Sequence, residues 1–382
     1  METRAAVIHD VGQKWTIERI RLDPPGPGEV LVRMAAAGLC HSDEHLTTGD
    51  GSYPNSVADQ RNWPRIFPMI GGHEGAGVVE EVGAGVTGLA PGDHVVASFI
   101  PACGRCTYCS SGRSYLCDQG GSLYSPGQIT DGTSRHWLGD TPLSFFCKIG
   151  CFAEHSVLAE SSLVKIGDDV PLPVAALVSC GVPTGWGSAV HTAETRPGDT
   201  VVVVGVGGIG INAVQGAAMV GARWVVAVDP IAWKCDRALE LGASHAAPSM
   251  AEARSLVAEL TRGRMADGVV LTHGVMEGEH LQQAMDLVGK GGTCVITSIA
   301  PGSQRSASLR LAELTTWAKQ IRGSLYGTLN PHEHVPILLD LYRQGRLELD
   351  GLITQTYSLD EINQGYEDLR EGRNLRGVVV FD

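Results

Sequence analysis

Four cysteines that lie close together in the sequence have a spacing typical of a metal site. Cys103, Cys106, Cys109 and Cys117 form the pattern C-x2-C-x2-C-x7-C. Four thiolates at this density suit a closed tetrahedral zinc site. An iron–sulfur cluster is the competing interpretation, but the bacterial ferredoxin pattern ends in C-x3-C-P, whereas here seven residues precede the last cysteine and Asp118 follows it. We therefore predict a structural zinc ion that stabilises a local lobe.

A second group of residues with metal-binding side chains lies nearer the N-terminus. Cys40, His41, Ser42, Asp43 and His45 fall within six residues. A stretch with so many polar groups is not expected in the core of a protein. Taken alone, the stretch is equally compatible with a solvated turn that carries one incidental thiol.

Three further candidates stand in turns next to apolar segments. His73 and Glu74 belong to the glycine-rich sequence GGHEGAGVVEEVG, in which the glycines let the backbone approach closely around the two side chains. Cys180 stands in a Ser-Cys-Gly turn beside an apolar segment. Because a buried cysteine is commonly part of the packing, Cys180 alone indicates little.

The sequence VVVVGVGGIG indicates a dinucleotide-binding site. Val201–Val204 suits a strand buried on both faces, and Gly205, Gly207 and Gly210 fit G-x-G-x-x-G before a helical stretch. A second apolar strand ends at Asp229, nineteen residues after Gly210. The glycines and the helix N-terminus suit a pyrophosphate. Asp229 can accept hydrogen bonds from ribose hydroxyls and would repel a 2′-phosphate, so we predict NAD rather than NADP.

The sequence around these residues predicts a β-rich region followed by a region of alternating strands and helices. Short strands are predicted for residues 1–35, whereas residues 50–68 and 119–148 are rich in the residue types that favour loops. From residue 197 onward, short apolar strands alternate with predicted helices, which is the pattern of a parallel sheet. These helices lie near 211–220, 233–241, 250–262 and 278–288, and further helices are predicted at 332–345 and 362–372 before a final strand.

Length, charge and composition limit the class of protein. The chain has 382 residues, which suits two domains. Its net charge of −13 argues against nucleic-acid binding, which usually needs a basic patch. The sequence begins without the apolar stretch of a signal peptide and has no apolar run of membrane-spanning length. Ten cysteines in such a chain favour thiols and metal ligands over disulfides, so we expect a cytoplasmic protein.

Taken together, the motifs resemble the zinc-dependent medium-chain alcohol dehydrogenases over essentially the whole chain. The resemblance rests on GLCHSDEH, GGHEGAGVVEEVG, the CGRCTYC cluster with Cys117, SCGVPTGWGSAV, GVGGIG with Asp229, and the ending LRGVVVF, all in family order. It implies an α/β protein with a GroES-like, β-rich catalytic domain over 1–181 and 326–382. A Rossmann domain with a doubly wound parallel sheet would be inserted at 182–325.

The same resemblance implies the chemistry and the metal ligands. The enzyme would move a hydride between an alcohol/aldehyde pair and NAD(H), with a catalytic and a structural zinc ion in each chain. Cys40, His73 and Cys180 would bind the catalytic zinc, which leaves one position for water or alcohol. Glu74 would be an alternate or outer ligand, and Asp43 would orient His73 through its other ring nitrogen. The four clustered cysteines would hold the structural zinc.

Further residues would serve proton transfer and cofactor binding. Ser42 would receive the alcohol proton, and His45 would pass it to solvent by way of the nicotinamide ribose. Simple packing is the expectation for Cys147, Cys151, Cys235 and Cys294. The residues predicted to contact the cofactor are His41, Thr184, Gly205, Gly207, Gly208, Ile209, Gly210, Asp229, Lys234 and Arg376.

Two features distinguish the chain within the family. His45 and His73 are 28 residues apart, farther than in the familiar animal enzymes, and we expect the extra residues 53–65 near the substrate entrance. Phe99, Phe146 and Cys147 are the candidate pocket residues. In finer detail the sequence resembles an actinobacterial subgroup of nicotinoproteins, the NDMA-dependent alcohol dehydrogenases. These enzymes keep NAD(H) bound through turnover and re-oxidise it with a second substrate or a nitroso dye.

Other functions remain open at this point. A thiol-dependent formaldehyde dehydrogenase of the same family would oxidise a hydroxymethyl-thiol adduct. A non-catalytic protein that reuses the fold would have lost its zinc ligands, whereas Cys40, His73, Glu74 and Cys180 all stand. The family resemblance also implies a homodimer or a homotetramer. We expect a small alcohol or aldehyde as substrate and neither a membrane nor a nucleic acid as partner.

Overall fold

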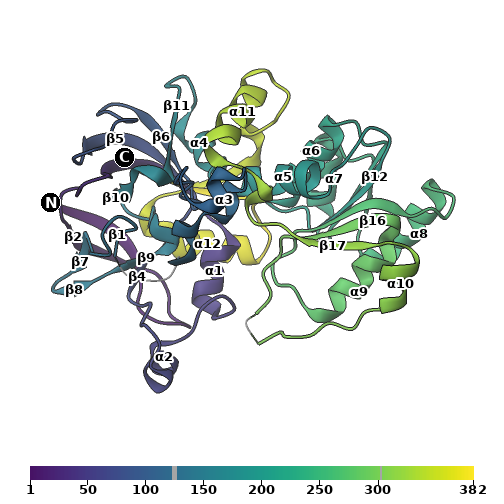
Figure 1. The fold of residues 1–382 in the computed structure, drawn as a ribbon, viewed down its shortest axis with the longest axis horizontal. Coiled ribbons are helices and arrows are strands. Elements are labelled where there is room, and N and C mark those ends of the chain that lie inside the picture. The colour runs from purple at the N-terminus through teal and green to yellow at the C-terminus, as the bar shows by residue number, and fades with distance from the viewer. Residues whose placement is uncertain (123–126, 302) are drawn as a thin grey trace. The chain divides into compact units, whose positions relative to one another are not determined.

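The computed structural model describes residues 1–122, 127–301 and 303–382, which form two compact units. The first unit comprises residues 1–180, 330–344 and 349–382, and the second comprises residues 181–329 and 345–348. The purple, blue and yellow segments of Figure 1 belong to the first unit, and most of the green segments belong to the second. The boundaries predicted from the sequence, after residue 181 and before residue 326, stay a prediction.

The first unit is built on two sheets. One has the strand order β8-β7-β2-β1-β4-β9, and the other has the order β11-β6-β5-β3-β19-β18, with β10 also paired to β3. Nearly every residue of β3 is buried, because it pairs with β5, β10 and β19. The strands are β1 (Glu2–Ile8), β2 (Thr16–Leu22), β3 (Glu29–Gly38), β4 (Met69–Ile70), β5 (Gly75–Val82), β6 (His94–Ala97), β7 (His136–Leu138), β8 (Thr141–Pro142), β9 (Ser144–Phe145), β10 (His155–Ala159), β11 (Leu163–Ile166), β18 (Ile353–Tyr357) and β19 (Arg376–Val380).

Residues 119–148, expected to be loop, contain three of these strands. β7, β8 and β9 are only two or three residues long, and they add to the edges of a sheet whose central strands come from the N-terminus. β7 and β8 pair with each other, but the strands that join them and β9 to the sheet, β2 and β4, lie far away in sequence, which local composition does not reveal. Residues 123–126 of this stretch lie outside the described residues.

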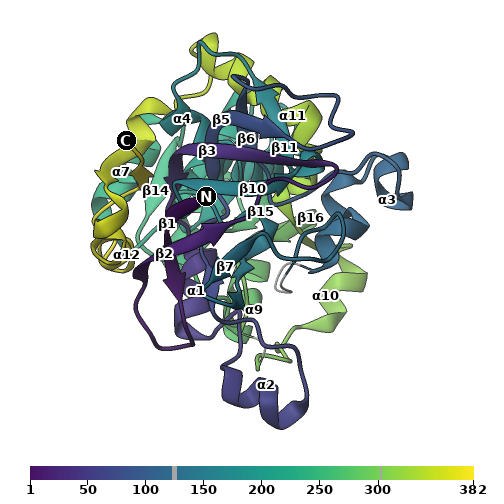
Figure 2. The same ribbon diagram turned by 90° about the vertical axis from the view of Figure 1, so that its left-hand side faces the viewer.

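Among the described residues, six α-helices accompany the sheets of the first unit, and α2 corrects a prediction. Residues 50–68 were expected to be loop, but α2 occupies Asn55–Arg61. Pro54 precedes the helix with extended backbone, and Asn62 ends it in the left-handed conformation, so the residues taken as loop signals act as helix ends. Both views show α2 apart from the sheets (Figure 1, Figure 2). The other helices are α1 (His41–Thr48), α3 (Thr107–Ser110), α4 (Leu172–Leu177), α11 (Pro331–Arg343) and α12 (Ile362–Arg370).

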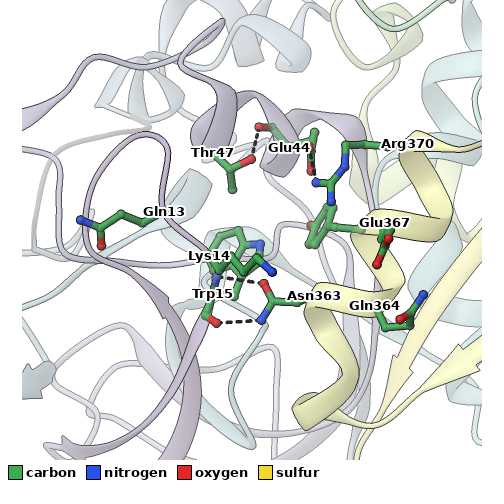
Figure 3. Close-up of a pocket in the computed structure, with 10 residues that line it drawn as sticks. Gln13, Lys14, Trp15, Glu44, Thr47, Asn363, Gln364, Glu367 and Arg370 are labelled. Atoms are coloured by element: carbon green, nitrogen blue, oxygen red, sulfur yellow. Dashed lines mark hydrogen bonds and ion pairs between the residues drawn. The ribbon is translucent and has the colours of Figure 1, made fainter.

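Helix α1 corrects a second expectation, because the polar stretch around Asp43 is neither a solvated turn nor exposed. Asp43, Glu44 and His45 are buried on α1. The burial is possible because the side chains have partners: Arg370 Nη1 of α12 donates to Glu44 Oε1 at 2.8 Å (Figure 3). Glu44 and Arg370 also line a pocket of about 340 Å³ between α1, α12 and the segment before β2. These contacts fix the helix that carries several predicted site residues.

The second unit is a parallel sheet of six strands in the order β14-β13-β12-β15-β16-β17. This order reverses direction beside β12, as in a doubly wound sheet. The predicted helices near 211–220, 233–241, 250–262 and 278–288 are confirmed as α6, α7, α8 and α9. The strands are β12 (Thr200–Val204), β13 (Trp224–Val228), β14 (His245–Ala247), β15 (Ala266–Leu271), β16 (Val288–Ile296) and β17 (Gln320–Gly323). The helices are α5 (Gly181–Gly187), α6 (Gly210–Met219), α7 (Ala232–Glu240), α8 (Met250–Leu260), α9 (Gly278–Leu287) and α10 (Leu311–Thr316).

The all-valine run of β12 forms the centre of this sheet. Val201–Val204 and the facing residues of β13 and β15 are buried. Val202 and Val204 join one cluster of apolar side chains with residues of β13, β15, α8 and α9. A strand that is covered on both faces needs an unbroken apolar sequence, which β12 has. Within the described part of the chain, no helix combines the length and the apolar character needed to cross a membrane.

Candidate active site

Four potential metal ligands meet inside the first unit. The ligand atoms of Cys40, His73, Glu74 and Cys180 all lie within 4.8 Å of one another, and all four residues are buried. Cys40 precedes α1, His73 and Glu74 lie between β4 and β5, and Cys180 follows α4. Residues that are far apart in sequence thus converge because the sheet brings the ends of these elements together. The donor set of two thiols and one imidazole fits zinc.

The imidazole of His73 is oriented by Asp43. His73 Nδ1 lies 2.9 Å from Asp43 Oδ2, and the Gly72 backbone N–H donates to Asp43 Oδ1 at 2.7 Å. Burial lowers the pKa of His73, but the charges of Asp43, Cys180 and Cys40 outweigh this effect and raise it above its ordinary value. Because Nδ1 is engaged by Asp43, the remaining nitrogen, Nε2, is the one that faces a metal in such sites.

The two thiols of the cluster differ in their pKa values. A hydrogen bond from Cys180 holds the pKa of Cys40 well below its ordinary value, and the same bond raises the pKa of Cys180. Two thiols that approach so closely in a buried site gain from a cation that lets both become thiolates. Their electrostatics therefore fit a divalent metal ion.

Glu74 is the fourth member of the cluster and pairs with Arg376. Arg376 Nη2 donates to Glu74 Oε2, and both side chains are buried. Burial raises the pKa of Glu74 to about 7 against the opposing charge of Arg376. A Cβ at Gly38 would collide with Glu74 Oε2, so glycine leaves room for the carboxylate. Glu74 Oε1 and Arg376 Nε are buried without a partner in the described structure, and they are the atoms free to meet a further group.

The wall of the cluster next to His73 is apolar. The rings of Phe99 and Phe146 stand edge-on to His73, with ring centres 5.7 and 5.2 Å away. Cys147 follows Phe146 and is buried with a left-handed backbone at φ 53°. Such a conformation is unfavourable for a residue with a Cβ and is enriched at functional sites. Phe99, Phe146 and Cys147 were the candidate pocket residues, and the two phenylalanines contact the cluster.

Helix α1 also carries the predicted proton-transfer residues. Ser42 Oγ lies 3.8 Å from Cys40 Sγ. His45 is only 4% exposed, whereas His41 at the start of the helix is exposed. His45 Nδ1 lies 3.5 Å from Oδ2 of Asp50, a residue that the sequence did not single out. A turn aspartate has no distinctive spacing, so no sequence signal pointed to it.

The four clustered cysteines form a second potential metal site in the first unit. Their sulfur atoms lie within 4.8 Å of one another. Backbone N–H groups of Asp118 and Cys109 lower the pKa of Cys106 to about 6, whereas burial raises that of Cys117 to about 12. Amide groups that point at sulfur atoms favour thiolates, as in closed four-cysteine zinc sites. The four cysteines whose spacing predicted a metal site therefore lie together in the structure.

The predicted dinucleotide residues lie together in the second unit. Gly205, with φ +87°, follows β12, and a Cβ there would lie 2.7 Å from the His273 backbone nitrogen. Nothing lies within 4 Å of a Cβ at Gly207, so the turn is open on that side. Gly208 and Ile209 continue the turn to Gly210, where the ten-residue α6 begins. This arrangement fits a pyrophosphate against the start of α6.

Asp229 follows β13 at the same edge of the sheet. Its two carboxylate oxygens accept the Val206 and Ile231 backbone N–H groups at 3.0 and 2.9 Å, which fixes the side chain beside the glycine turn. Lys234 lies on α7, and burial lowers its pKa against the attraction of Asp229. Thr184 Oγ1 is buried without a partner in the described structure. The remaining lone pairs of Asp229 suit ribose hydroxyls, so the site fits NAD.

The four cysteines expected only to pack are all buried as free thiols. Cys147 and Cys151 lie in the first unit, and Cys235 and Cys294 lie in the second. Burial raises the pKa of Cys294 to about 12, as is typical of a thiol that acts as a small apolar side chain.

Comparisons with protein families match two parts of the chain to two descriptions. Residues 26–168 match "Alcohol dehydrogenase GroES-like domain", and residues 208–344 match "Zinc-binding dehydrogenase". The first range contains both cysteine-rich groups of potential ligands except Cys180. The second range starts inside the glycine turn.

Relatives of the chain match it over their full lengths. The chain is 49% identical to an NDMA-dependent alcohol dehydrogenase of Amycolatopsis methanolica, over 100% of this chain and 99% of the relative. It is 45% identical to alcohol dehydrogenase B of Mycobacterium tuberculosis, with the same coverage. Identity falls to 34% for an S-(hydroxymethyl)glutathione dehydrogenase of Paracoccus denitrificans, although each chain is covered completely.

Solved structures give the same result. A zinc-binding alcohol dehydrogenase domain protein from Burkholderia ambifaria superposes with a TM-score of 0.90 at 32% identity, covering 100% of this chain and 99% of the other. A benzyl alcohol dehydrogenase from Acinetobacter calcoaceticus superposes with a TM-score of 0.89 at 28% identity, covering both chains completely. The predicted fold class and family are confirmed. The chain is an oxidoreductase that belongs to the zinc-dependent medium-chain alcohol dehydrogenases, whose cofactors are zinc and NAD(H).

Proposed function

We propose that the buried cluster of Cys40, His73 and Cys180 holds the catalytic zinc of an enzyme that interconverts primary alcohols and aldehydes. The observation that carries this proposal is the convergence of their ligand atoms, with those of Glu74, within 4.8 Å in a buried site. Glu74 is the alternate or outer ligand, and its pairing with Arg376 balances the charge. When bound, zinc lowers the pKa of an alcohol and polarises a carbonyl.

The surrounding residues then perform three tasks. Asp43 holds the His73 ring so that Nε2 is directed at the cluster. Ser42, beside Cys40, accepts the proton of the alcohol, and His45 carries it onward. Phe99 and Phe146 shield the reacting carbon from water and leave an apolar wall for its substituent. This wall favours alcohols with an apolar side, such as aliphatic or aromatic primary alcohols.

In the second unit, we assign NAD(H) to the glycine turn and Asp229. His41, Thr184, Lys234 and Arg376 are the proposed additional contacts. Arg376 retains an unpartnered Nε, and Thr184 an unpartnered Oγ1, both of which are buried. Buried donors of this kind are costly unless a ligand satisfies them.

We also infer that the cofactor stays bound during turnover. The support is the 49% identity to a relative described as NDMA-dependent. An enzyme of this kind needs a second substrate that re-oxidises NADH in place.

Denaturation of the purified protein tests cofactor retention. NAD(H) released near one equivalent per chain, together with turnover on a primary alcohol and a nitroso dye without added NAD, is the expected result. No released NAD(H), with steady turnover on added NAD, would contradict retention while leaving the dehydrogenase assignment intact. An absolute requirement for a low-molecular-weight thiol with formaldehyde would favour the alternative, a thiol-dependent formaldehyde dehydrogenase. Normal alcohol turnover also excludes a non-catalytic protein.

A homodimer or homotetramer is our proposal for the assembled enzyme. In sequence, Trp317 precedes edge strand β17 of the second unit and Leu325 follows it, and these side chains are 41% and 44% exposed. Apolar side chains beside an open sheet edge favour association with another chain. A cytoplasmic location is a further proposal, which all ten free cysteines support. Light scattering would show a monomer if the association proposal is wrong.

A further inference from the structure

The burial of His45 raises a question about the path of the proton. His45 is only 4% exposed, yet it is the proposed last residue of proton transfer to solvent. A buried imidazole that becomes charged needs a counter-charge, and it needs a polar route outward. The structure supplies one candidate for both, because Asp50 Oδ2 lies 3.5 Å from His45 Nδ1 and the Asp50 side chain is 31% exposed.

The position of Asp50 is fixed by the turn that ends α1. Gly49 closes the helix in the left-handed conformation, and its N–H donates to the His45 carbonyl oxygen at 3.1 Å. The Gly51 N–H donates to the same oxygen at 3.2 Å. Thr48 Oγ1 donates to Asp50 Oδ2 at 2.7 Å. The chain therefore folds back over His45 and holds the carboxylate against its ring.

The other charged groups around α1 have partners of their own. Glu44 is paired with Arg370, and Asp43 is engaged by His73 and by the Gly72 N–H. Asp10 accepts the backbone N–H groups of Val11 and Asn55. Among the described residues, Asp50 is thus the charged group that forms an ion pair with His45.

We propose that Asp50 is a positioning residue of the proton path, which accepts the Nδ1–H of His45 and leads the proton to solvent. The carboxylate favours the tautomer with the lone pair on Nε2, the base that receives the proton. When the N–H bond at Nε2 forms, Asp50 stabilises the imidazolium. The N–H bond at Nδ1 then breaks, and Asp50 passes the proton to water or buffer at its exposed edge. Proton exchange with water restores the Nδ1–H tautomer for the next turnover.

The separation of 3.5 Å is longer than a direct hydrogen bond, and one water or a small ring rotation can close it. Hydrogen bonds of catalytic groups are often long before substrate binds. As in other histidine–carboxylate pairs, the carboxylate sets the tautomer of the imidazole and stabilises its cation.

The inference rests on the proposed role of His45, so its test uses both residues. Asp50→Asn keeps the shape and removes the charge, and His45→Gln removes the base. Asp360→Asn is the matched control, because Asp360 is an exposed carboxylate that pairs with Arg4 on the surface of the same unit. The measurement is the pH dependence of kcat/KM for oxidation of a primary alcohol with a nitroso dye as acceptor.

We expect Asp50→Asn to lower kcat/KM throughout the pH range measured, because the Nδ1–H tautomer and the imidazolium of His45 both lose the carboxylate that stabilises them. The loss should be roughly tenfold, smaller than the factor of about 100 or more that loss of the base itself costs. Asp50→Glu should recover part of the loss. In the His45→Gln protein, Asp50→Asn should add no further loss, and Asp360→Asn should match the unsubstituted protein.

The outcomes separate the two claims. A slow His45→Gln protein combined with an unchanged Asp50→Asn profile would overturn the role of Asp50 and leave the proton path through His45. An unchanged His45→Gln protein would overturn the path itself. Equal losses from Asp50→Asn in the presence and absence of His45 would assign Asp50 a purely structural role and also contradict the inference.

Discussion

Glu74 and Arg376 form a buried ion pair although 302 residues separate them in the sequence. Glu74 precedes β5, and Arg376 opens β19, the last strand of the chain. The pair places the guanidinium beside the four potential zinc ligands. It therefore ties the C-terminal strand to the metal cluster, and removal of one partner would leave an uncompensated buried charge.

Arg376→Leu should lower the stability of the protein by about 3–5 kcal/mol, the usual cost of an unpaired buried charge. Adding Glu74→Gln should restore part of that loss, because the second substitution removes the unpaired carboxylate. The urea midpoints of the two single variants and of the double variant measure this coupling. Additive losses would show that the two side chains do not stabilise each other.

Cys106→Ser should remove one of two zinc ions per chain, because four thiolates are needed to close the structural site. Metal analysis of the purified protein would give about one zinc ion per chain for the variant, with a lower thermal midpoint. Cys294→Ser is the matched control, since Cys294 is a buried thiol in the second unit, far in sequence from the tetrad. An unchanged zinc content in Cys106→Ser would refute the structural site.

Asp229→Asn should weaken retention of NAD(H) and reduce the discrimination against NADP. The amide keeps an oxygen for the Val206 or Ile231 N–H but loses the charge that repels a 2′-phosphate. The amount of nucleotide that remains bound through purification, and its identity, give the readout. Asp236→Asn, on the exposed face of α7, serves as the control. If the unsubstituted protein bound NAD and NADP equally well, the proposed role of Asp229 would be wrong.

His136 should make the stability of the protein fall in acid. Burial lowers the pKa of His136 to about 3 in the folded protein, whereas the unfolded value is about 6.5. The unfolded chain therefore binds the proton first, so stability is complete above the unfolded pKa and is lost as pH falls toward 3. The loss at pH 5 is on the order of 2 kcal/mol. Urea unfolding at several pH values should show a shallower acid limb for His136→Gln, and parallel curves would contradict the assignment.

Much of the secondary structure of the second unit could be predicted from the sequence, because the patterns that indicate it involve residues close together in the chain. The valines of β12, the glycine turn and Asp229 lie within thirty residues, and each strand is followed by a helix with its own apolar spacing. The cysteine tetrad is equally local. Cys40, His73 and Cys180 were predicted from family motifs, and only the fold brings them together.

The missed features depend on contacts between distant residues. The polar start of α1 is buried because Arg370, 326 residues away, neutralises Glu44. Helix α2 forms although its sequence contains many loop-forming residues, and its flanks pack Tyr53 against Trp63 and pair Asp59 with Arg65. Asp50 gains its importance only from the turn that folds over His45. None of these partners is visible in a local sequence pattern.

The central claim, that Cys40, His73 and Cys180 hold a zinc ion that activates the alcohol, is tested most directly with Cys40→Ser. Zinc content and alcohol oxidation should be measured on the same preparation, with circular dichroism to confirm folding. The account predicts about one zinc ion per chain, retained folding and loss of alcohol oxidation. Full activity in Cys40→Ser, or two zinc ions with unchanged turnover, would contradict it.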